Sequence, residues 1–316
     1  MRVARHQTNS ARASFRSAPA GQDHCGSADF GVGLTYWAVG RQNVYDDPSF
    51  FAGYRKMRAN RAGLHENVVH PALPLLLEGD LLGSRILDLG CGDGWFCKIA
   101  LEGGAEAVVG IDPSYRMLAD ARASITDSRA SFVQGFVEDA EFEASSFDLI
   151  ASIFALHYVE DFVGVTRSIA RWLVPGGVLA VVVEHPVMTC QHELDWVRDD
   201  GGEPIAWPVC NYHDEGGRVE HWFIDGVVKY HRRIETIVNA LREAHFTIER
   251  LIEPAPAPEI VEFGRGRSSL IRPEVLGIRA RKATIGRSVG ASFANAAHAS
   301  GLPQGRATTF MHRVGG

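Results

Sequence analysis

One stretch, Arg85–Asp112, constrains the fold of this 316-residue chain more than any other. Its pattern predicts a buried strand, a glycine-rich turn, a helix and a second strand that ends at an acid: Ile86–Leu89, Gly90–Gly94, Trp95–Leu101, Ala107–Ile111 and Asp112. Such a β-α-β unit has parallel strands and a right-handed crossover. The glycines let a ligand approach the backbone, and the helix start offers unpaired N–H groups. Asp112 stands where a carboxylate can accept hydrogen bonds from both ribose hydroxyls of a nucleoside.

The residues around the turn distinguish two kinds of nucleoside ligand. The nicotinamide fingerprint G-x-G-x-x-G requires glycine where this chain has Trp95. Asp88, at the end of the first strand, would repel phosphates but suits a ligand that carries an ammonium group. The run from Asp88 to Gly94, DLGCGDG, resembles the D-x-G-x-G-x-G signature of class I S-adenosylmethionine (SAM) methyltransferases. Between about Tyr45 and Lys282, further stretches such as ALHYVEDF and LVPGGVL resemble bacterial members of this family that act on small molecules.

This resemblance implies SAM as the cofactor, with S-adenosylhomocysteine as its product. In the family the glycine loop surrounds the methionine part of SAM, and the acid after the second strand holds the ribose. Tyr54 and Arg58 lie one turn apart in an expected helix, so they could face the SAM carboxylate together or pack in the core.

The resemblance leaves the adenine contacts more open. Met117 could touch the adenine or belong to the core. Phe136 stands where the family most often has an acid against the adenine amino group, so Glu138 and Asp139 are the local candidates. The full set of cofactor-binding candidates is Tyr54, Arg58, Asp88, Gly90, Gly92, Asp112, Pro113, Met117, Glu138, Asp139 and Ser152.

Methyl transfer from a sulfonium is an in-line displacement that depends mainly on alignment and needs no metal. A general base matters only if the acceptor atom carries a proton. The catalytic candidates are His157, Glu184, His185 and Tyr212, with Glu215, His221 and His231 as further choices. His157 and the Glu184–His185 pair could equally have structural roles. His231–Arg232, beside Lys229, could hold an acidic group of the acceptor or lie in solvent, and Trp222 favours an aromatic acceptor.

The order of expected elements indicates an α/β fold with a Rossmann-like, seven-stranded, mostly parallel sheet and helices on both faces. We expect a disordered extension over residues 1–40, a methyltransferase domain over 41–282 and a disordered tail over 283–316. An N-terminal helical lid begins near Tyr45. A β-rich cap, residues 186–228, follows the fifth strand, and its expected hairpin turns at Asp225–Gly226. The cap departs from the family at Cys210–Asn211, where Asp-Gly is expected.

The composition limits the classes of binding partner that we expect for this protein. The net charge of -6 argues against nucleic acid or an anionic membrane, and no apolar run is long enough to span a bilayer. Five cysteines show neither disulfide-like nor zinc-like spacing, so we expect a cytoplasmic protein. The expected partner is a small-molecule methyl acceptor, and the oligomeric state stays open.

Three alternatives remain beside a small-molecule methyltransferase. An RNA or protein methyltransferase is disfavoured by the acidic balance and by Phe154–His157 in place of an N/D-P-P-Y/F tetrapeptide. A SAM-binding protein without catalysis would carry the same loop and ribose acid. A nicotinamide oxidoreductase is disfavoured by Trp95 and Asp88.

Overall fold

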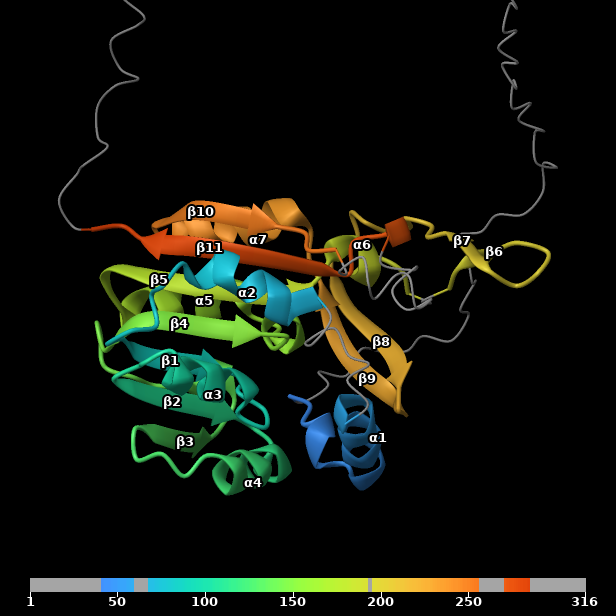
Figure 1. Ribbon diagram of the computed structural model, residues 1–316. Helices are drawn as coiled ribbons and strands as arrows, with labels where there is room; N and C mark the ends of the chain where they lie inside the picture. The colour runs from blue at the N-terminus through green and yellow to red at the C-terminus, as the bar shows by residue number, and fades with distance from the viewer. Residues whose placement is uncertain (1–40, 60–67, 193–194, 256–269, 285–316) are drawn as a thin grey trace, which may run out of the picture.

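The computed structural model describes residues 41–59, 68–192, 195–255 and 270–284. Within them seven strands form one sheet in the order β10-β11-β5-β4-β1-β2-β3 (Figure 1). The strands are β1 Arg85–Leu89, β2 Ala107–Asp112, β3 Ala130–Gln134, β4 Phe147–Ile153, β5 Leu173–Glu184, β10 Phe246–Ile252 and β11 Val275–Lys282. Only β11 runs antiparallel to its neighbours, β5 and β10. The predicted Rossmann-like, mostly parallel sheet is confirmed.

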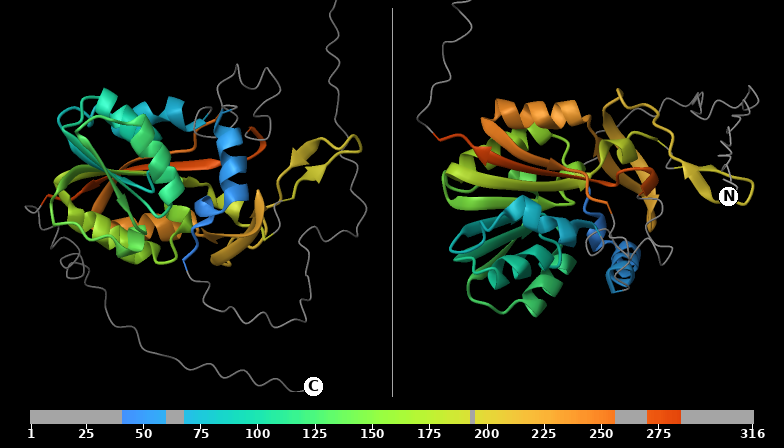
Figure 2. Two further views of the ribbon diagram at one scale, coloured as in Figure 1. Left: turned by 90° about the horizontal axis from the view of Figure 1, so that it is seen from below. Right: turned by 45° about the horizontal axis from the view of Figure 1, so that its top comes forward.

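Helices cover both faces of this sheet (Figures 1 and 2). On one face lie α2 His70–Leu77, α3 Trp95–Glu102 and α4 Tyr115–Ser124, and on the other lie α5 Phe162–Trp172 and α7 Ile234–Glu243. The central strands β1 and β4 are buried on both sides, which explains their continuous apolar runs. Each helix places an apolar stripe on the strands, as α5 does with Val165, Ile169 and Trp172.

Two additions stand over the carboxyl ends of the parallel strands. The first, here called the lid, consists of η1 Val44–Asp46 and α1 Pro48–Ala59. The second, the hairpin, consists of β8 Gly216–Trp222 and β9 Ile224–His231, and it lies beside α1 (Figure 2). Gly53 of α1 permits this close packing, because a Cβ there would come within 2.6 Å of the Phe223 ring. The remaining short elements are η3 Val137–Asp139, η4 Leu156–Tyr158, α6 Pro186–Thr189, β6 Val197–Arg198 and β7 Pro204–Ala206.

The hairpin turn differs from the prediction. It lies at Phe223, which has a φ of 63°, while Asp225–Gly226 falls inside β9. The observed register pairs Trp222 with Ile224. This placement puts the Trp222 ring 5.1 Å from that of Phe50 in the lid. Aromatic packing between hairpin and lid therefore outweighs the local turn preference of Asp-Gly.

The first segment of β5 is irregular. The strand starts at Leu173, and its register with β4 shifts between Phe147 and Leu149. Pro175–Gly177 lies at this irregularity within the strand. The predicted extension over 1–40 and nearly all of the predicted tail over 283–316 lie outside the described residues. Among the described residues no helix is long and apolar enough to cross a membrane.

Candidate active site

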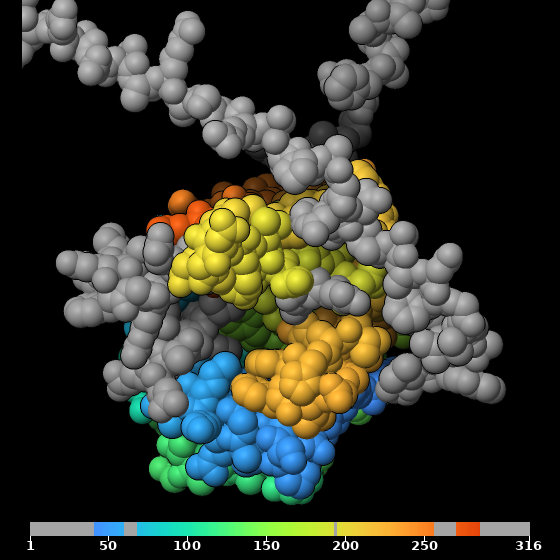
Figure 3. Space-filling model, turned by 90° about the vertical axis from the view of Figure 1, so that its right-hand side faces the viewer, coloured from blue at the N-terminus to red at the C-terminus, as the bar shows by residue number. Residues whose placement is uncertain are grey.

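A cavity of about 650 Å³ lies at the carboxyl ends of β1, β2, β4 and β5. The lid and the hairpin form its outer walls, and in the space-filling view the hairpin rests directly against α1 (Figure 3). The third apolar cluster of the molecule joins these walls to α4 through Phe50, Met117 and Val227. The sheet order places the β1 and β2 loops towards one end of the cavity and β5 towards the other.

The glycine turn after β1 adopts a conformation that only glycine accommodates. Gly90 has a φ of 74°, and a Cβ there would lie 2.2 Å from the Cβ of Ala155. The Gly90 and Cys91 N–H groups donate to the Ile111 carbonyl at 2.8 and 3.0 Å, which ties the turn to β2. Gly90, Cys91 and Gly92 also line the cavity, so the predicted turn forms part of its wall.

Asp112 is fixed at the end of β2 by two backbone donors. Its Oδ1 accepts a hydrogen bond from Ser114 N at 2.9 Å, and its Oδ2 accepts one from Gly92 N at 3.0 Å. Burial raises the pKa of this carboxyl to about 6, although both hydrogen bonds oppose the rise. Each oxygen keeps a further lone pair, so the carboxylate can still accept hydrogen bonds from a pair of ribose hydroxyls.

Asp88 is the second buried acid at this end of the cavity, with 1% exposure. Burial raises its pKa to about 7, and only the Cys97 thiol, 3.3 Å from Oδ2, opposes the rise. No basic side chain of the described residues contributes to this shift. A ligand ammonium group would favour the ionised carboxylate, so the residues present fit the methionine part of SAM.

Asp46 holds the lid against the start of α4, a role that the sequence alone does not predict. Asp46 accepts hydrogen bonds from Ser114 Oγ at 2.6 Å and from Arg116 N at 3.2 Å, at the first turn of α4. A carboxylate is favourable at a helix N-terminus because it meets the unpaired N–H groups there. Ser114 is the N-cap of α4, and its Oγ also accepts a hydrogen bond from Met117 N at 3.1 Å. No local pattern links Asp46 to a helix about seventy residues away.

The predicted cofactor residues fall into two groups. Those that line the cavity are Tyr54, Asp88, Gly90, Gly92, Asp112, Pro113, Met117 and Glu138. Three others are absent from the described lining. Ser152 is fully buried and donates to the Leu89 carbonyl at 3.1 Å. Asp139 forms an ion pair with Arg41, a lining residue. Arg58 lies outside the lining, with its Nε 4.0 Å from Oδ2 of Asp93, a lining residue.

The far end of the cavity contains a buried cluster of charges, here called the Lys229 cluster. Lys229 Nζ lies 2.6 Å from Glu184 Oε1 and forms a second ion pair with Glu220. The three side chains are only 5, 11 and 12% exposed. Lys229 also lies 4.8 Å from the centroid of the Trp222 ring. Lys229 is therefore buried and paired with acids of the chain itself.

His157 lines the same end of the cavity and is 5% exposed. Its Nδ1 is buried and has no hydrogen-bond partner among the described residues. Burial lowers the pKa of this imidazole to about 4, and the nearby Glu184 opposes the shift. His157 is therefore neutral at pH 7, with a lone pair available on one ring nitrogen. Its ring lies 4.4 Å from that of Tyr158, another lining residue.

Two other catalytic candidates lie away from the cavity lining. His185 Nδ1 accepts a hydrogen bond from Val187 N at 3.0 Å and so caps α6, while Nε2 lies 2.8 Å from Glu253. The Tyr212 carbonyl accepts from His231 Nε2 at 3.1 Å, and the Tyr212 hydroxyl accepts from Ile234 N at 3.4 Å. Of the further choices, His221 lines the cavity, whereas Glu215 and His231 do not.

Comparisons with known proteins agree with this geometry. Residues 87–181 match the family model of a methyltransferase domain. Over 247 residues the chain is 37% identical to an uncharacterized protein of Haemophilus influenzae, a match that covers 76% of this chain and 97% of that protein. A solved S-adenosylmethionine-dependent methyltransferase from Mesorhizobium loti is 39% identical, with a TM-score of 0.63 and coverage of 67% of this chain and 96% of that one. A solved putative S-adenosylmethionine-dependent methyltransferase from Listeria monocytogenes is 36% identical, with a TM-score of 0.63. That match covers 66% of this chain and 96% of the other.

The chain therefore belongs to the class I SAM-dependent methyltransferases. It is a SAM-dependent methyltransferase with SAM as its methyl donor, and both predictions are confirmed. The nicotinamide oxidoreductase alternative is excluded. None of these three relatives is assigned a methyl acceptor by its description.

Proposed function

We propose that this enzyme methylates an oxygen, nitrogen or electron-rich carbon atom of a small aromatic acceptor. The observation that supports this best is the single cavity that reaches from the glycine turn and Asp112 to His157 and Glu184. Its volume of about 650 Å³ is in the range of small-molecule sites. Tyr45, Tyr158 and Trp222 line it and offer ring surfaces on which an aromatic acceptor can pack.

Within this proposal the near end of the cavity holds the cofactor. Asp112 binds the ribose hydroxyls, Asp88 faces the ammonium group, and Met117 with Glu138 borders the adenine. Arg58 acts from behind Asp93 and Trp95, whose side chains it contacts. Ser152 and Asp139 then support the site indirectly, since Ser152 ties β4 to β1 and Asp139 holds Arg41 in the wall.

When bound, SAM supplies an electrophilic methyl group on a sulfonium. The chain must align the acceptor and take up its proton if it carries one. We assign the base role to His157, because it is neutral at pH 7 and its Nδ1 has no partner among the described residues. A weak base suffices, since the acceptor atom becomes strongly acidic as its bond to the methyl carbon forms. Glu184 is the second candidate, but Lys229 already occupies it.

His185 and Tyr212 receive structural roles in this proposal. His185 caps α6 and contacts Glu253, which keeps the chain direction after β5. Tyr212 contacts His231 and the start of α7, so it joins the cap to the domain. Replacing either residue should lower stability more than it changes the affinity for SAM.

Calorimetric titration with SAM, S-adenosylhomocysteine and NADH tests the cofactor site. We expect both adenosyl ligands to bind and NADH not to bind. Asp112→Ala should weaken adenosyl binding by about 10- to 100-fold, because it removes hydrogen bonds to a charged acceptor. Asp200→Ala, an exposed acid in the β6–β7 hairpin, is the matched control and should bind normally. Unchanged affinity in Asp112→Ala would contradict the assigned ribose contact.

Transfer of labelled methyl groups then tests the acceptor. A panel of small phenols, aromatic amines and indoles should contain accepted compounds, whereas RNA and protein should stay unlabelled. Labelling of macromolecules alone would favour the RNA or protein alternative. SAM binding without transfer to any compound or macromolecule would favour a protein that binds SAM without catalysis.

A further inference from the structure

The Lys229 cluster carries one more acid than base, and this surplus bears on the acceptor. We propose that the acceptor carries a protonated amine that binds at Glu184 and Glu220, and that acceptors with a carboxylate or phosphate are excluded. This inference rests on the proposed function and narrows its substrate class. It concerns the far end of the cavity, away from the glycine turn.

The first argument is the state of Lys229. Its ammonium group is buried and already bound to two carboxylates, while its outer side lies near the Trp222 ring. An acceptor anion would have to displace one of these carboxylates, which would then remain buried without a partner. Such a broken buried pair is unfavourable. Lys229 therefore orders the two acids and does not offer a free positive charge.

The second argument is the charge that remains. One ammonium group cannot neutralise two carboxylates, so Glu184 and Glu220 together with Lys229 have a net charge of −1 when all are ionised. The pKa values reflect this imbalance. Lys229 holds the pKa of Glu184 low against the effect of burial, whereas burial and the charge of Glu184 raise the pKa of Glu220. Of the two carboxylates, Glu220 is thus the one whose ionised form Lys229 stabilises less.

The third argument is the rest of the wall. Among the described lining residues, acids outnumber Lys and Arg side chains by eight to two. This surplus of acids disfavours a carboxylate acceptor and favours a cationic one. Near the acids, His157, Tyr158 and Trp222 also line the space and offer ring surfaces. An aromatic ring with a cationic side chain meets each of these features.

Matched pairs of ligands test the proposal on protein saturated with S-adenosylhomocysteine. The pairs are tyramine with 4-hydroxyphenylacetate, tryptamine with indole-3-acetate, and dopamine with 3,4-dihydroxyphenylacetate. Within a pair the ring is constant and the side-chain charge is reversed. We expect at least one amine to bind about tenfold more tightly than its acid by calorimetry and ligand-observed NMR. Equal binding, tighter binding of the acids, or no binding of any amine would overturn the proposal.

Two variants locate the preference. Glu220→Gln keeps a hydrogen-bond acceptor for Lys229 and removes the surplus charge, so it should reduce the preference for amines about tenfold. Asp225→Asn makes the same charge change on the same hairpin at an exposed site outside the lining, and it should not alter the preference. Binding of S-adenosylhomocysteine to each protein is measured separately. If S-adenosylhomocysteine does not bind to the wild type, the proposed function is contradicted. If it binds normally but amines are not preferred, only this inference is contradicted.

Discussion

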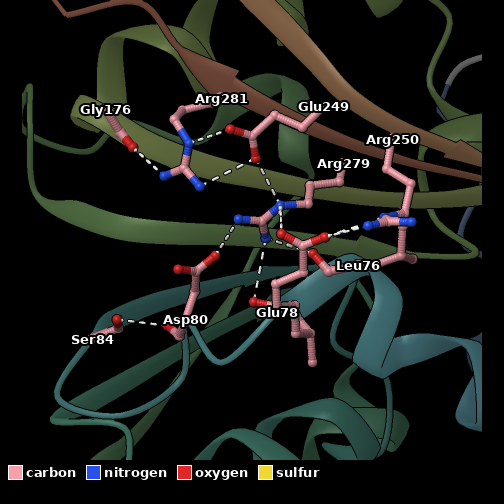
Figure 4. A network of polar contacts seen from close by, with 10 residues as sticks. Leu76, Glu78, Asp80, Ser84, Gly176, Glu249, Arg250, Arg279 and Arg281 are labelled. Carbon is pink, nitrogen blue, oxygen red and sulfur yellow. Dashed lines mark hydrogen bonds and ion pairs between the residues drawn. The ribbon is translucent and has the colours of Figure 1, made fainter.

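Two buried cations of this protein have carboxylate partners but different surroundings. Arg279 on β11 is 1% exposed, and it contacts Glu249 at 2.8 Å and Asp80 at 2.6 Å (Figure 4). It also donates to the Leu76 carbonyl at 2.8 Å. Lys229 on β9 contacts two acids where Arg279 contacts three, and the acids at Lys229 line the cavity. The first cluster joins α2 to the sheet edge, and the second borders a space for ligand.

The charge balance of the two clusters separates their roles. At the sheet edge, Arg250 and Arg281 add to Arg279 and meet Glu78, Asp80 and Glu249, so three cations face three acids (Figure 4). At the cavity, one lysine faces two acids. A balanced network is complete within the chain and serves stability. An unbalanced one retains capacity for a charged group from outside, which is a property expected of a binding site.

The largest effect is expected at the balanced cluster. Arg279→Met leaves the three acids of the network with only two arginines. It also removes the hydrogen bond that Arg279 donates to the Leu76 carbonyl. We expect the free energy of unfolding to fall by about 3 kcal/mol in urea denaturation, because the variant breaks a buried pair. The affinity for S-adenosylhomocysteine should not change. Arg250→Met, a control at a partly exposed member of the network, should cost less than about 1 kcal/mol. Equal costs for the two variants would contradict a special role for the buried arginine.

The next effect concerns acid sensitivity at the cavity. His157 has a pKa of about 4 in the folded protein, below the value of about 6.5 expected for the unfolded chain. Between these values the unfolded state binds more protons, so stability must fall as the pH falls. We expect His157 to account for a loss of about 2 kcal/mol between pH 7 and pH 5.

Urea denaturation at both pH values measures this contribution. His157→Gln should lose less stability on acidification than the wild type does. The control His213→Gln, at an exposed position, should behave as the wild type. If His157→Gln and the wild type show the same loss, the imidazole is not held neutral by its site.

A third effect tests the unbalanced cluster directly. Lys229→Met leaves Glu184 and Glu220 buried without their cation, so they bind a proton more tightly in the folded state than in the unfolded state. Stability should then fall as pH rises from 5 to 8, with a cost of about 1–2 kcal/mol at pH 7. This cost is smaller than at Arg279 because the cavity admits water. Adding Glu220→Gln to the variant should restore part of the loss, and a double variant without recovery would contradict the proposed repulsion.

The fold could be predicted because its signals are local. The apolar runs of β1 and β4, the glycine turn and the acid at Asp112 all lie within short windows, and each has one structural meaning. The hairpin turn was mispredicted, because the contact of Trp222 with Phe50 in the lid decided its register. Such a contact between distant segments leaves no local pattern.

The site could be predicted only in part for the same reason. Asp88, Asp112 and His157 line the cavity at the positions that strand order implies. Glu184 is a candidate from the sequence, but its pairing with Lys229 spans 45 residues, and no local pattern singles out Glu220. His185 and Tyr212 were chosen for their chemistry, and their partners turn them away from the cavity. Residue type suggests chemistry, but only packing decides which atoms face a ligand.

The smallest predicted effect concerns the acids at the cofactor end. Asp88 has a pKa of about 7. The acids around Arg279 have basic partners, whereas no basic side chain among the described residues contributes to the pKa shift of Asp88. A ligand ammonium group favours the ionised form, so affinity should fall as Asp88 becomes protonated. We expect S-adenosylhomocysteine to bind about threefold more weakly at pH 6.5 than at pH 7.5. Calorimetry in two buffers of different ionisation enthalpy should also detect proton release on binding. Asp88→Asn should bind more weakly and lose this pH dependence, whereas a wild-type affinity that stays constant or rises towards pH 6.5 would show that Asp88 does not face the ammonium group.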